Sequence, residues 1–407
     1  MNYSETLNWL FSQLPNYQLQ GQSAYKPGLQ NIKKLVDLTG SEILQSRFFH
    51  VAGTNGKGSV CNTLASIMIE HGYKTGLFTS PHLHDFRERI RINGKMITED
   101  FVINFVSQYK QAWEEIKPSF FEITTVMALS AFKQAQCDVC IIETGLGGRL
   151  DSTNIITPDI SIITNIGLDH TQFLGDTLEK IAFEKAGIIK KNIPVVIGEY
   201  TDETKPVFEH AANLHDAPLY FASSVSGIVS DLKGNFQQKN IATVMKAIEV
   251  LSTKGWNFVP QKIRDGFQHV AKNTSFSGRF QKLQDNPTVI VDAAHNEQGV
   301  KTLFADIMQL KFDNLHLIYG AANDKDVSRI FKLFPKDACY YFTEFNSKRS
   351  LLTDDFISLA NEFNLNADFF SSSADAIAAA YETAGENDLI FVFGSFYLIQ
   401  EILPVKN

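Results

Sequence analysis

A glycine-rich string at residues 50–60, HVAGTNGKGSV, contains the residue types that bind phosphate groups. Its glycines let the backbone fold around a phosphate and turn N–H groups inward. The apolar run before it is typical of a strand and the run after it of a helix, whose N-terminus would add a partial positive charge to the full charge of Lys57. The hydroxyl of Ser59 would face the metal ion that accompanies a nucleotide. The string therefore predicts a phosphate-binding loop made of Gly53, Thr54, Asn55, Gly56, Lys57, Gly58 and Ser59.

The spacing of this loop departs from the strict Walker A pattern. That pattern requires four residues between its first glycine and Gly-Lys, and a Ser or Thr directly after the lysine. Here Thr54 and Asn55 alone separate Gly53 from Gly56, and Gly58 stands between Lys57 and Ser59. A glycine-rich turn without a ligand is therefore the alternative interpretation.

Two carboxylates close apolar, strand-like runs. Glu143 ends VCIIE and is followed by TGLGG, and Asp292 ends TVIVD and is followed by AAHN. The carboxyl end of a strand in a parallel sheet faces the crevice where ligands bind. Both carboxylates are therefore candidate site residues, and a surface charge on a turn is the alternative for Glu143.

The elements that must position these residues alternate along the chain. Short apolar runs and helix-length amphipathic segments predict an α/β protein whose parallel-rich sheet is covered on both faces. A polar, turn-rich stretch at 271–287 interrupts the alternation. We therefore expect a division near residue 285, with a first domain over 1–284 and a smaller doubly wound domain over 285–407. A nucleotide and its acceptor are expected to meet in a cleft between them. The runs that predict strands are VCIIE (139–143), ISIIT (160–164), IPVVIG (193–198), TVIVD (288–292), LHLIYG (315–320), ACYYFTE (338–344) and DLIFVFGS (388–395).

The composition is ordinary for a globular chain. The 407 residues carry a formal net charge of −8, which argues against nonspecific nucleic-acid binding. No apolar run approaches the length of a membrane span, and the N-terminal segment lacks the pattern of a signal peptide. Cys137 and Cys140 form a lone C-x-x-C, which we expect to be two buried thiols. We expect a cytoplasmic monomer that binds neither nucleic acid nor membranes.

Longer motifs extend over nearly the whole chain, in order between roughly residues 20 and 400. Together with GTNGKGS they resemble the folylpolyglutamate synthase and dihydrofolate synthase family of the Mur ligase superfamily. The motifs are TSPHL (79–83), ERIRING (88–94), SFFEITT (119–125), ETGLGGRLDSTN (143–154), TNIGLDHTQFLGDTLEKIAFEKAGIIK (164–190), GRFQ (278–281) and DAAHN (292–296).

The resemblance implies both a fold and a reaction. The fold is a P-loop-containing Mur-ligase-type ATPase domain followed by a smaller Rossmann-like domain. The reaction is the ATP-dependent addition of L-glutamate to dihydropteroate, to a folate such as tetrahydrofolate, or to both. A carboxylate is a poor electrophile, so ATP first converts it to an acyl phosphate, and ADP and phosphate are released. The residues on the pterin side favour a bifunctional enzyme, and a dedicated folylpolyglutamate synthase is the alternative.

Two other classes of protein stay open. A Mur-type ligase for a UDP-linked cell-wall precursor usually carries a UDP-binding domain ahead of its phosphate-binding loop, but only about 50 residues precede the loop here. A nucleotide-binding switch or motor explains the loop, but it assigns no task to the second domain.

The resemblance also implies a set of metal ligands. Ser80, Glu143 and His170 match the residues that bind Mg²⁺ in the family, although a histidine is a less typical Mg²⁺ ligand. Lys185 matches a lysine that is commonly carbamylated near a second metal ion. Without the resemblance, His170 reads as a core histidine or a helix cap. Without it, Lys185 would be interpreted as a surface charge, or as the partner of Glu184 or Glu179 in an ion pair, on a helix that begins near Asp176 or Thr177.

The remaining candidates contact the nucleotide or the substrates. The planar guanidinium of Arg279 suits phosphate oxygens, with an interdomain salt bridge as its alternative. The family implies that Asn240 contacts adenine, although an asparagine that opens a helix can also be a cap. Further positions implied by the family are Asp292 and His295 for ribose and phosphate, Phe121 and Asp151 for the pterin, AYKPGL (24–29) beside the folate, and Ser395 for the incoming glutamate. Phe121 in a core and Asp151 as a turn cap are the structural alternatives.

Overall fold

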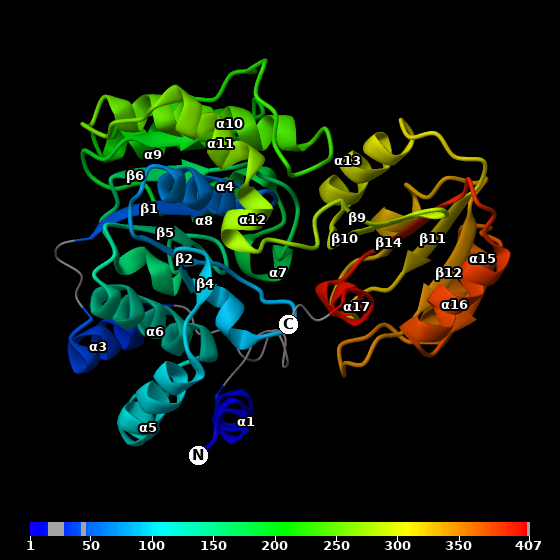
Figure 1. Cartoon of the computed structure of the whole chain (residues 1–407), viewed down its shortest axis with the longest axis horizontal. Coiled ribbons are helices and arrows are strands. Elements are labelled where there is room, and N and C mark those ends of the chain that lie inside the picture. Colours follow the sequence, from blue (N-terminus) through cyan, green and yellow to red (C-terminus); the bar gives the residue numbers. More distant parts are fainter. Residues whose placement is uncertain (15–27, 42–45, 405–407) are drawn as a thin grey trace. The chain divides into compact units, whose positions relative to one another are not determined.

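The computed structural model describes residues 1–14, 28–41 and 46–404, and within these residues the chain forms two compact units (Figure 1). The first unit comprises residues 1–231 and 237–276. The second comprises residues 277–407 together with the short segment Leu232–Phe236, so the chain enters the second unit, returns to the first and enters the second again. The sequence predicts a division near residue 285, and in the structure the second change of unit lies between Phe276 and Ser277.

An eight-stranded sheet in the order β4-β3-β2-β5-β1-β6-β7-β8 forms the centre of the first unit. The strands from β2 to β8 in this order are parallel, and β3 and β4 extend the sheet as antiparallel strands. Their bounds are β1 (Arg47–Ala52), β2 (Thr75–Phe78), β3 (Ile90–Ile92), β4 (Lys95–Met96), β5 (Val139–Glu143), β6 (Ile160–Ile163), β7 (Val195–Ile197) and β8 (Leu219–Phe221).

Helices cover both faces of this sheet, which explains why its inner strands are apolar on both sides. Helices α4, α10 and α11 contribute to the buried cluster on one face, and α5 and α6 contribute to the cluster on the other (Figure 1). The bounds are α1 (Tyr3–Gln13), α3 (Gln30–Thr39), α4 (Lys57–Glu70), α5 (Glu99–Ile116), α6 (Phe120–Ala135), α7 (Thr171–Leu174), α8 (Leu178–Ala186), α9 (Lys205–Leu214), α10 (Gln237–Ser252), α11 (Pro260–Gln268) and α12 (Val270–Thr274).

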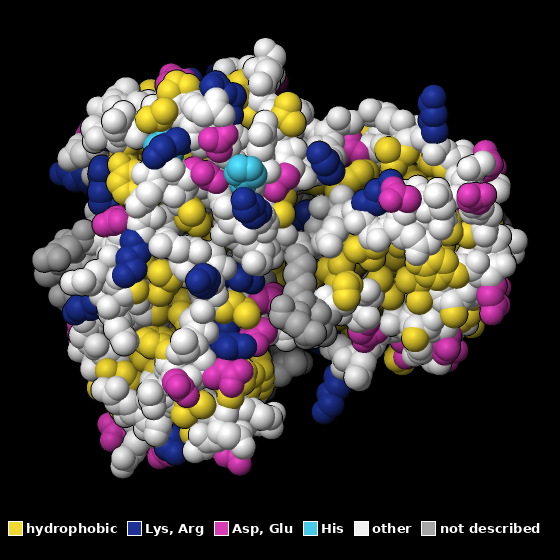
Figure 2. Space-filling view, viewed as in Figure 1, with side chains coloured by type: hydrophobic (Ala, Val, Ile, Leu, Met, Phe, Trp, Pro, Cys, Tyr) yellow, Lys and Arg dark blue, Asp and Glu magenta, His cyan; other side chains and the backbone are white. Residues whose placement is uncertain are grey.

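The surface of the described chain is mixed in charge. On the face drawn in Figure 2, Lys and Arg side chains lie among Asp and Glu side chains. None of the helices within the described residues combines the length and the apolar character needed to cross a membrane. The thiols of Cys137 and Cys140 are buried and free, as the sequence predicts.

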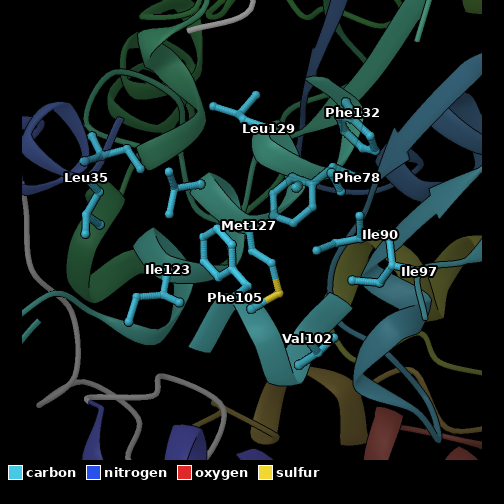
Figure 3. Packing of buried hydrophobic residues seen from close by; sticks show 14 of the residues in the cluster. Leu35, Phe78, Ile90, Ile97, Val102, Phe105, Ile123, Met127, Leu129 and Phe132 are labelled. Carbon is cyan, nitrogen blue, oxygen red and sulfur yellow. The ribbon is translucent and has the colours of Figure 1, made fainter. Parts of the chain in front are cut away.

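Aromatic and aliphatic side chains from α5, α6 and the adjoining strands form a close-packed core in the first unit (Figure 3). Phe78 of β2 and Phe132 of α6 are fully buried in it, and Met127 fills the space between α6 and α5. Gly76 lies under the Phe132 ring, where an added methyl carbon would come within 2.7 Å of the ring. This packing fixes α6 against β2 and so determines where the start of α6 lies relative to the strand ends.

The second unit contains a six-stranded sheet in the order β13-β12-β11-β14-β10-β9, in which only β9 is antiparallel to its neighbour. Because β14 lies between β10 and β11, the loops that follow β14 and β10 are neighbours. The strands are β9 (Gln281–Asp285), β10 (Thr288–Asp292), β11 (Leu315–Tyr319), β12 (Cys339–Thr343), β13 (Ala367–Phe370) and β14 (Leu389–Phe393), and the helices are α13 (Glu297–Ile307), α14 (Ser328–Phe331), α15 (Thr353–Glu362), α16 (Ser373–Thr383) and α17 (Phe396–Ile402).

Candidate active site

The glycine-rich string forms the loop between β1 and α4, and its backbone requires glycine at two positions. Gly53 has φ +148° and Gly56, which precedes α4, has φ +81°. A methyl carbon at Gly53 would lie 1.8 Å from Thr164 Oγ1, and one at Gly56 would lie 2.3 Å from Asn240 Oδ1. Gly58 is less constrained, since a methyl carbon there would meet its nearest neighbour, the Phe276 ring, at 3.4 Å.

The loop after β6 holds the first half of the phosphate-binding loop through hydrogen bonds. Thr54 N–H donates to the Asn165 carbonyl (3.0 Å) and Asn55 N–H to Asn165 Oδ1 (2.9 Å). Thr164 Oγ1 donates to the Asn55 carbonyl at 2.6 Å. These N–H groups are thus already used within the protein. A phosphate would meet the N–H groups at the start of α4, those of Lys57, Gly58 and Ser59, which have no partner inside a helix.

Two lysine side chains converge on one carbonyl oxygen of this loop. Lys57 Nζ donates to the Gly53 carbonyl at 2.9 Å and to the Thr54 carbonyl at 3.1 Å. Lys185 Nζ, from α8, donates to the same Gly53 carbonyl at 2.8 Å. Burial, and next the positive charge of Lys57, lower the pKa of Lys185 to about 7. A substantial fraction of Lys185 is therefore a neutral amine at neutral pH.

Helix α8 begins at one of the two residues expected from the sequence. Thr177 precedes the helix and accepts a hydrogen bond from Lys180 N–H. Glu184 forms an ion pair with Arg149. Lys185 is 4% exposed, so the interpretation of Lys185 as a surface charge is wrong.

Glu143 and Ser80 lie together at the ends of the neighbouring strands β5 and β2. Glu143 Oε2 accepts a hydrogen bond from Ser80 N–H at 3.2 Å, and it lies 4.0 Å from the position of a methyl carbon at Gly58. The strand register pairs Glu143 with Val51, two residues before the phosphate-binding loop. The side chain is 3% exposed, so the interpretation of Glu143 as a surface charge is also wrong.

His170 directly precedes the short helix α7 and has a left-handed backbone with φ +50°. Its N–H donates to Asp169 Oδ1 at 2.8 Å, which holds this turn. Across the described ranges, no group of three or more His, Cys, Asp and Glu side chains is arranged to hold a metal ion. The predicted ligands Ser80, Glu143 and His170 offer one hydroxyl, one carboxylate and one imidazole, so they are not a group of that kind. A Mg²⁺ ion bound by these three side chains would keep further coordination positions for phosphate oxygens and water. Oxygen donors at Ser80 and Glu143 suit Mg²⁺.

Asp151 uses both carboxylate oxygens within its own loop. Oδ2 accepts the N–H groups of Gly145 (2.9 Å) and Leu146 (2.8 Å), and Oδ1 accepts both the N–H (3.0 Å) and the hydroxyl (2.5 Å) of Thr153. Burial raises the pKa of Asp151, although these hydrogen bonds oppose the rise. The side chain therefore caps the turn that follows Glu143, which is the structural alternative for this residue. A pterin would have to displace one of these bonds to reach it.

His50 of β1 contacts this cap through Thr153. Its Nε2 lies 2.8 Å from Thr153 Oγ1. The single hydroxyl proton of Thr153 is donated to Asp151, so His50 Nε2 must carry the proton of their shared hydrogen bond. Burial lowers the pKa of His50 to about 3, which keeps the ring neutral.

Phe121 lies in the first turn of α6 and is partly exposed. A methyl carbon at Gly145 would lie 2.5 Å from its ring, and the Phe78 ring centre is 5.7 Å away. The ring thus covers the start of the loop after Glu143. The segment AYKPGL lies outside the described residues at positions 24–27.

The first turn of α10 also contacts the phosphate-binding loop. Asn240, the fourth residue of α10, packs against Gly56 and donates to Gln237 Oε1 at 2.7 Å, so it does not cap the helix. Gln237 Nε2 lies 3.4 Å from the Ser59 hydroxyl.

In the second unit, four predicted residues gather at the adjoining ends of β10 and β14. The guanidinium of Arg279 lies 4.7 Å from the centre of the Phe396 ring, and the His295 ring lies 6.1 Å from that ring. Asp292 accepts the N–H groups of Phe280 and Ala294, both at 2.7 Å. Burial raises the pKa of Asp292, and the charge of Arg279 opposes the rise. Ser395 caps α17 by accepting Tyr397 N–H.

Several residues of the site were missed from the sequence. Thr164, Asn165 and Gln237 contact the phosphate-binding loop or Ser59. Thr164 and Asn165 open the motif at 164–190 that carries the resemblance, and Gln237 lies three residues before Asn240, so these positions were the available signal.

Comparison with known proteins gives two family matches. Residues 51–246 match the Mur ligase middle domain, and residues 278–396 match the "Mur ligase, glutamate ligase domain". Among curated proteins, the chain is 33% identical to the dihydrofolate synthase/folylpolyglutamate synthase of Bacillus subtilis, over 98% of each chain. The solved structure of Escherichia coli FolC in complex with DHPP and ADP has a TM-score of 0.86 and 29% identity, covering 99% of this chain and 97% of that one. A bifunctional folylpolyglutamate synthase/dihydrofolate synthase solved with Mn, AMPPNP and L-glutamate has a TM-score of 0.84 and 28% identity, covering 99% and 97%.

Proposed function

The chain belongs to the Mur ligase family, within its dihydrofolate synthase/folylpolyglutamate synthase group, and we propose that it uses ATP to join L-glutamate to dihydropteroate and to folates through an acyl phosphate. The observation that carries this proposal is the convergence of Lys57 and Lys185 on the Gly53 carbonyl beside Glu143. A nucleotide switch needs one lysine at its phosphates. A ligase must also screen the charge between a phosphate and an approaching carboxylate, and Lys185, as a carbamate, would contribute to this by holding a second Mg²⁺ there.

The residues of the first unit would bind the phosphates in an ordered way. The N–H groups of Lys57, Gly58 and Ser59 would contact phosphate oxygens, while the Asn165 contacts keep the preceding loop in place. The ammonium of Lys57 would turn from the backbone carbonyls to the terminal phosphate and balance the charge that develops there. Ser80, Glu143 and His170 would hold Mg²⁺, which when bound neutralises phosphate charge and polarises the transferred group. Lys185 would act as a carbamate beside a second Mg²⁺.

The second unit would supply the contacts to L-glutamate and part of the nucleotide site. Arg279 presents a planar cation suited to phosphate oxygens, and His295 and Asp292 lie beside it. Ser395 has its hydroxyl committed as a cap, so a contact to glutamate there would use its remaining hydrogen-bonding capacity. We also propose a cytoplasmic monomer, consistent with the four free cysteines.

The proposal of a bifunctional enzyme rests on the pterin side of the site. Phe121 offers a partly exposed ring next to the turn that follows Glu143, a position suited to stacking on a flat heterocycle. The test supplies dihydropteroate and tetrahydrofolate in parallel with ATP, Mg²⁺ and L-glutamate, and analyses the products by mass. Both acceptors should gain a glutamate, with one ADP released for each. If dihydropteroate is not extended, the enzyme is a dedicated folylpolyglutamate synthase, and if ADP release does not depend on L-glutamate, the ligase proposal fails.

Replacing Glu143 by glutamine should raise the Mg²⁺ concentration needed for half-maximal activity, by about tenfold or more, with a smaller change in the KM for L-glutamate. An amide oxygen keeps the shape of the ligand but loses the charge that holds a divalent ion. The measurement is a Mg²⁺ titration of ADP release. A variant whose metal dependence and activity at saturating Mg²⁺ equal those of the unmodified enzyme would show that Glu143 is not a ligand.

Replacing Asp151 by alanine should lower the free energy of unfolding by about 2–3 kcal/mol, because it leaves the N–H groups of Gly145, Leu146 and Thr153 without their acceptor. Since the cap serves the turn that follows Glu143, activity towards dihydropteroate and tetrahydrofolate should fall by similar factors. Denaturant unfolding and the two product assays measure this. A selective loss of dihydrofolate synthesis, without loss of stability, would instead support direct contact between Asp151 and the pterin.

A further inference from the structure

Helix α10 is joined to the phosphate-binding loop by a chain of polar contacts that is separate from Asn240. Asn165 accepts the Asn55 N–H with Oδ1 and donates from its amide nitrogen to Glu199 Oε1 at 3.3 Å. Glu199 Oε2 accepts a hydrogen bond from Lys239, in the first turn of α10. The contacts thus run from the loop, through the ends of β6 and β7, to the residue next to Asn240.

The backbone at the end of β7 allows this close approach. Gly198 precedes Glu199, and a methyl carbon at Gly198 would lie 2.4 Å from both the Thr164 carbonyl and the Thr243 hydroxyl of α10. Glu199 N–H also donates to the Thr164 carbonyl at 2.9 Å. The backbone of Glu199 is therefore fixed next to the loop, and its side chain has a defined path to Asn165.

The chemistry of Glu199 determines which way the Asn165 amide faces. An asparagine amide can rotate to exchange its oxygen and nitrogen, and only the orientation with Oδ1 towards Asn55 accepts that N–H. A carboxylate only accepts hydrogen bonds, so it favours the orientation in which the Asn165 nitrogen points towards it. Lys239 binds the other carboxylate oxygen, Oε2, and so holds the carboxylate of Glu199 in place.

We propose that Glu199, held by Lys239, is a positioning residue for nucleotide binding. It orients the Asn165 amide, which holds Asn55 and so sets the position of the N–H groups that follow at the start of α4. The proposal rests on the proposed function in one respect, namely that this loop binds the phosphates of ATP. It adds residues that touch neither nucleotide nor metal, and it predicts that they act on nucleotide affinity and not on the other substrates.

The test measures ADP binding by calorimetry for the unmodified enzyme and for Glu199→Gln and Glu199→Ala. The Gln variant keeps the size of the side chain, but its amide can donate to Asn165 Oδ1 and so permits the wrong orientation. Both variants should raise the Kd for ADP by about fivefold, the scale of one hydrogen bond at a partly exposed site. The KM for ATP should rise by a similar factor, with the KM for L-glutamate unchanged.

Two further variants separate positioning from general stability. Glu249→Ala removes another ion pair of α10, that between Lys246 and Glu249, and should leave the Kd for ADP unchanged. Lys239→Met should weaken ADP binding about twofold, and Lys239→Arg should restore it. Without nucleotide, all variants should unfold at the same temperature within about 1 °C.

The outcomes distinguish this inference from the proposed function. If the unmodified enzyme does not bind ADP, the proposed nucleotide site itself is contradicted. Normal binding by the unmodified enzyme, with the same affinity in Glu199→Gln and Glu199→Ala, would overturn the positioning role alone. An equal rise in the KM values for ATP and L-glutamate would also overturn it, since that result indicates a general structural effect.

Discussion

Replacing Lys57 by alanine lowers kcat by at least about 100-fold and leaves the fold intact. The side chain donates only to the Gly53 and Thr54 carbonyls among its hydrogen bonds in the described part of the chain, so folding does not depend on a charged partner for it. Its cationic role begins when the phosphates are bound, and the loss of one preorganised charge-stabilising donor has an effect of this size. Glutamate-dependent ADP release gives kcat, and circular dichroism with thermal unfolding reports on the fold.

The matched control for this prediction is Lys254→Ala, which removes an exposed lysine after α10. That variant should retain full activity. Near-normal ADP release by Lys57→Ala would contradict the assignment of the phosphate site. Loss of activity accompanied by unfolding would contradict the second half of the prediction, that the fold does not need this charge.

Replacing Lys185 by alanine should abolish turnover, and high concentrations of acetate should restore part of it. We propose that Lys185 is carbamylated, because its neutral amine, present in quantity at a pKa of about 7, is the form that adds to CO₂. A carbamate carries a carboxylate-like group, and acetate can occupy the space left in the alanine variant. Lys190→Ala is the control, since Lys190 also donates to a backbone carbonyl, that of Asn154, and acetate should have no effect on that variant.

The carbamate itself can be observed by ¹³C NMR after incubation with ¹³C-bicarbonate and nucleotide. The signal should be present in the unmodified enzyme and absent from Lys185→Ala. Its rate of appearance should fall as the pH drops below about 7, because protonation removes the reactive amine, by about tenfold for each pH unit. No signal in the unmodified enzyme would rule out the modification.

Most inner strands were predictable from the sequence because burial on both faces leaves a continuous apolar run, but the short inner strand β2 (Thr75–Phe78), which contains Gly76, was not expected. All seven expected runs are strands, from Val139–Glu143 to Leu389–Phe393. The edge strands were not expected, for the same physical reason. β4 (Lys95–Met96) is exposed, and β9 (Gln281–Asp285) is largely polar. β8 (Leu219–Phe221) and β13 (Ala367–Phe370) are only partly buried, so none of the four needs a buried apolar run.

The predicted site was recovered in part. The phosphate-binding loop, Lys185 and Glu143 were found from their motifs, and the structure brings them together. Asp151 and Ser395 act as caps in the structure. Residue type alone does not distinguish a cap from a ligand contact, because both roles use the same side-chain oxygen atoms. The contact between Asn165 and Asn55 could not be predicted, because it depends on the register of β6 against β1, which pairs Ala52 with Ile163.

The passage of the chain into the second unit at Leu232–Phe236 means that the two units cannot be divided by a single cut. Within the second unit, the Phe236 ring lies 6.5 Å from that of Phe280, and the Phe236 N–H donates to the buried carboxylate of Asp306 at 3.4 Å. A fragment that begins at residue 277 would lack this segment, expose Phe280 and leave Asp306 without that donor. After cleavage by a protease between residues 276 and 277, the two pieces would still be held together non-covalently, because residues 232–236 of the first piece pack in the second unit. To obtain the second unit as an independent fragment, residues 232–236 would have to be grafted onto it.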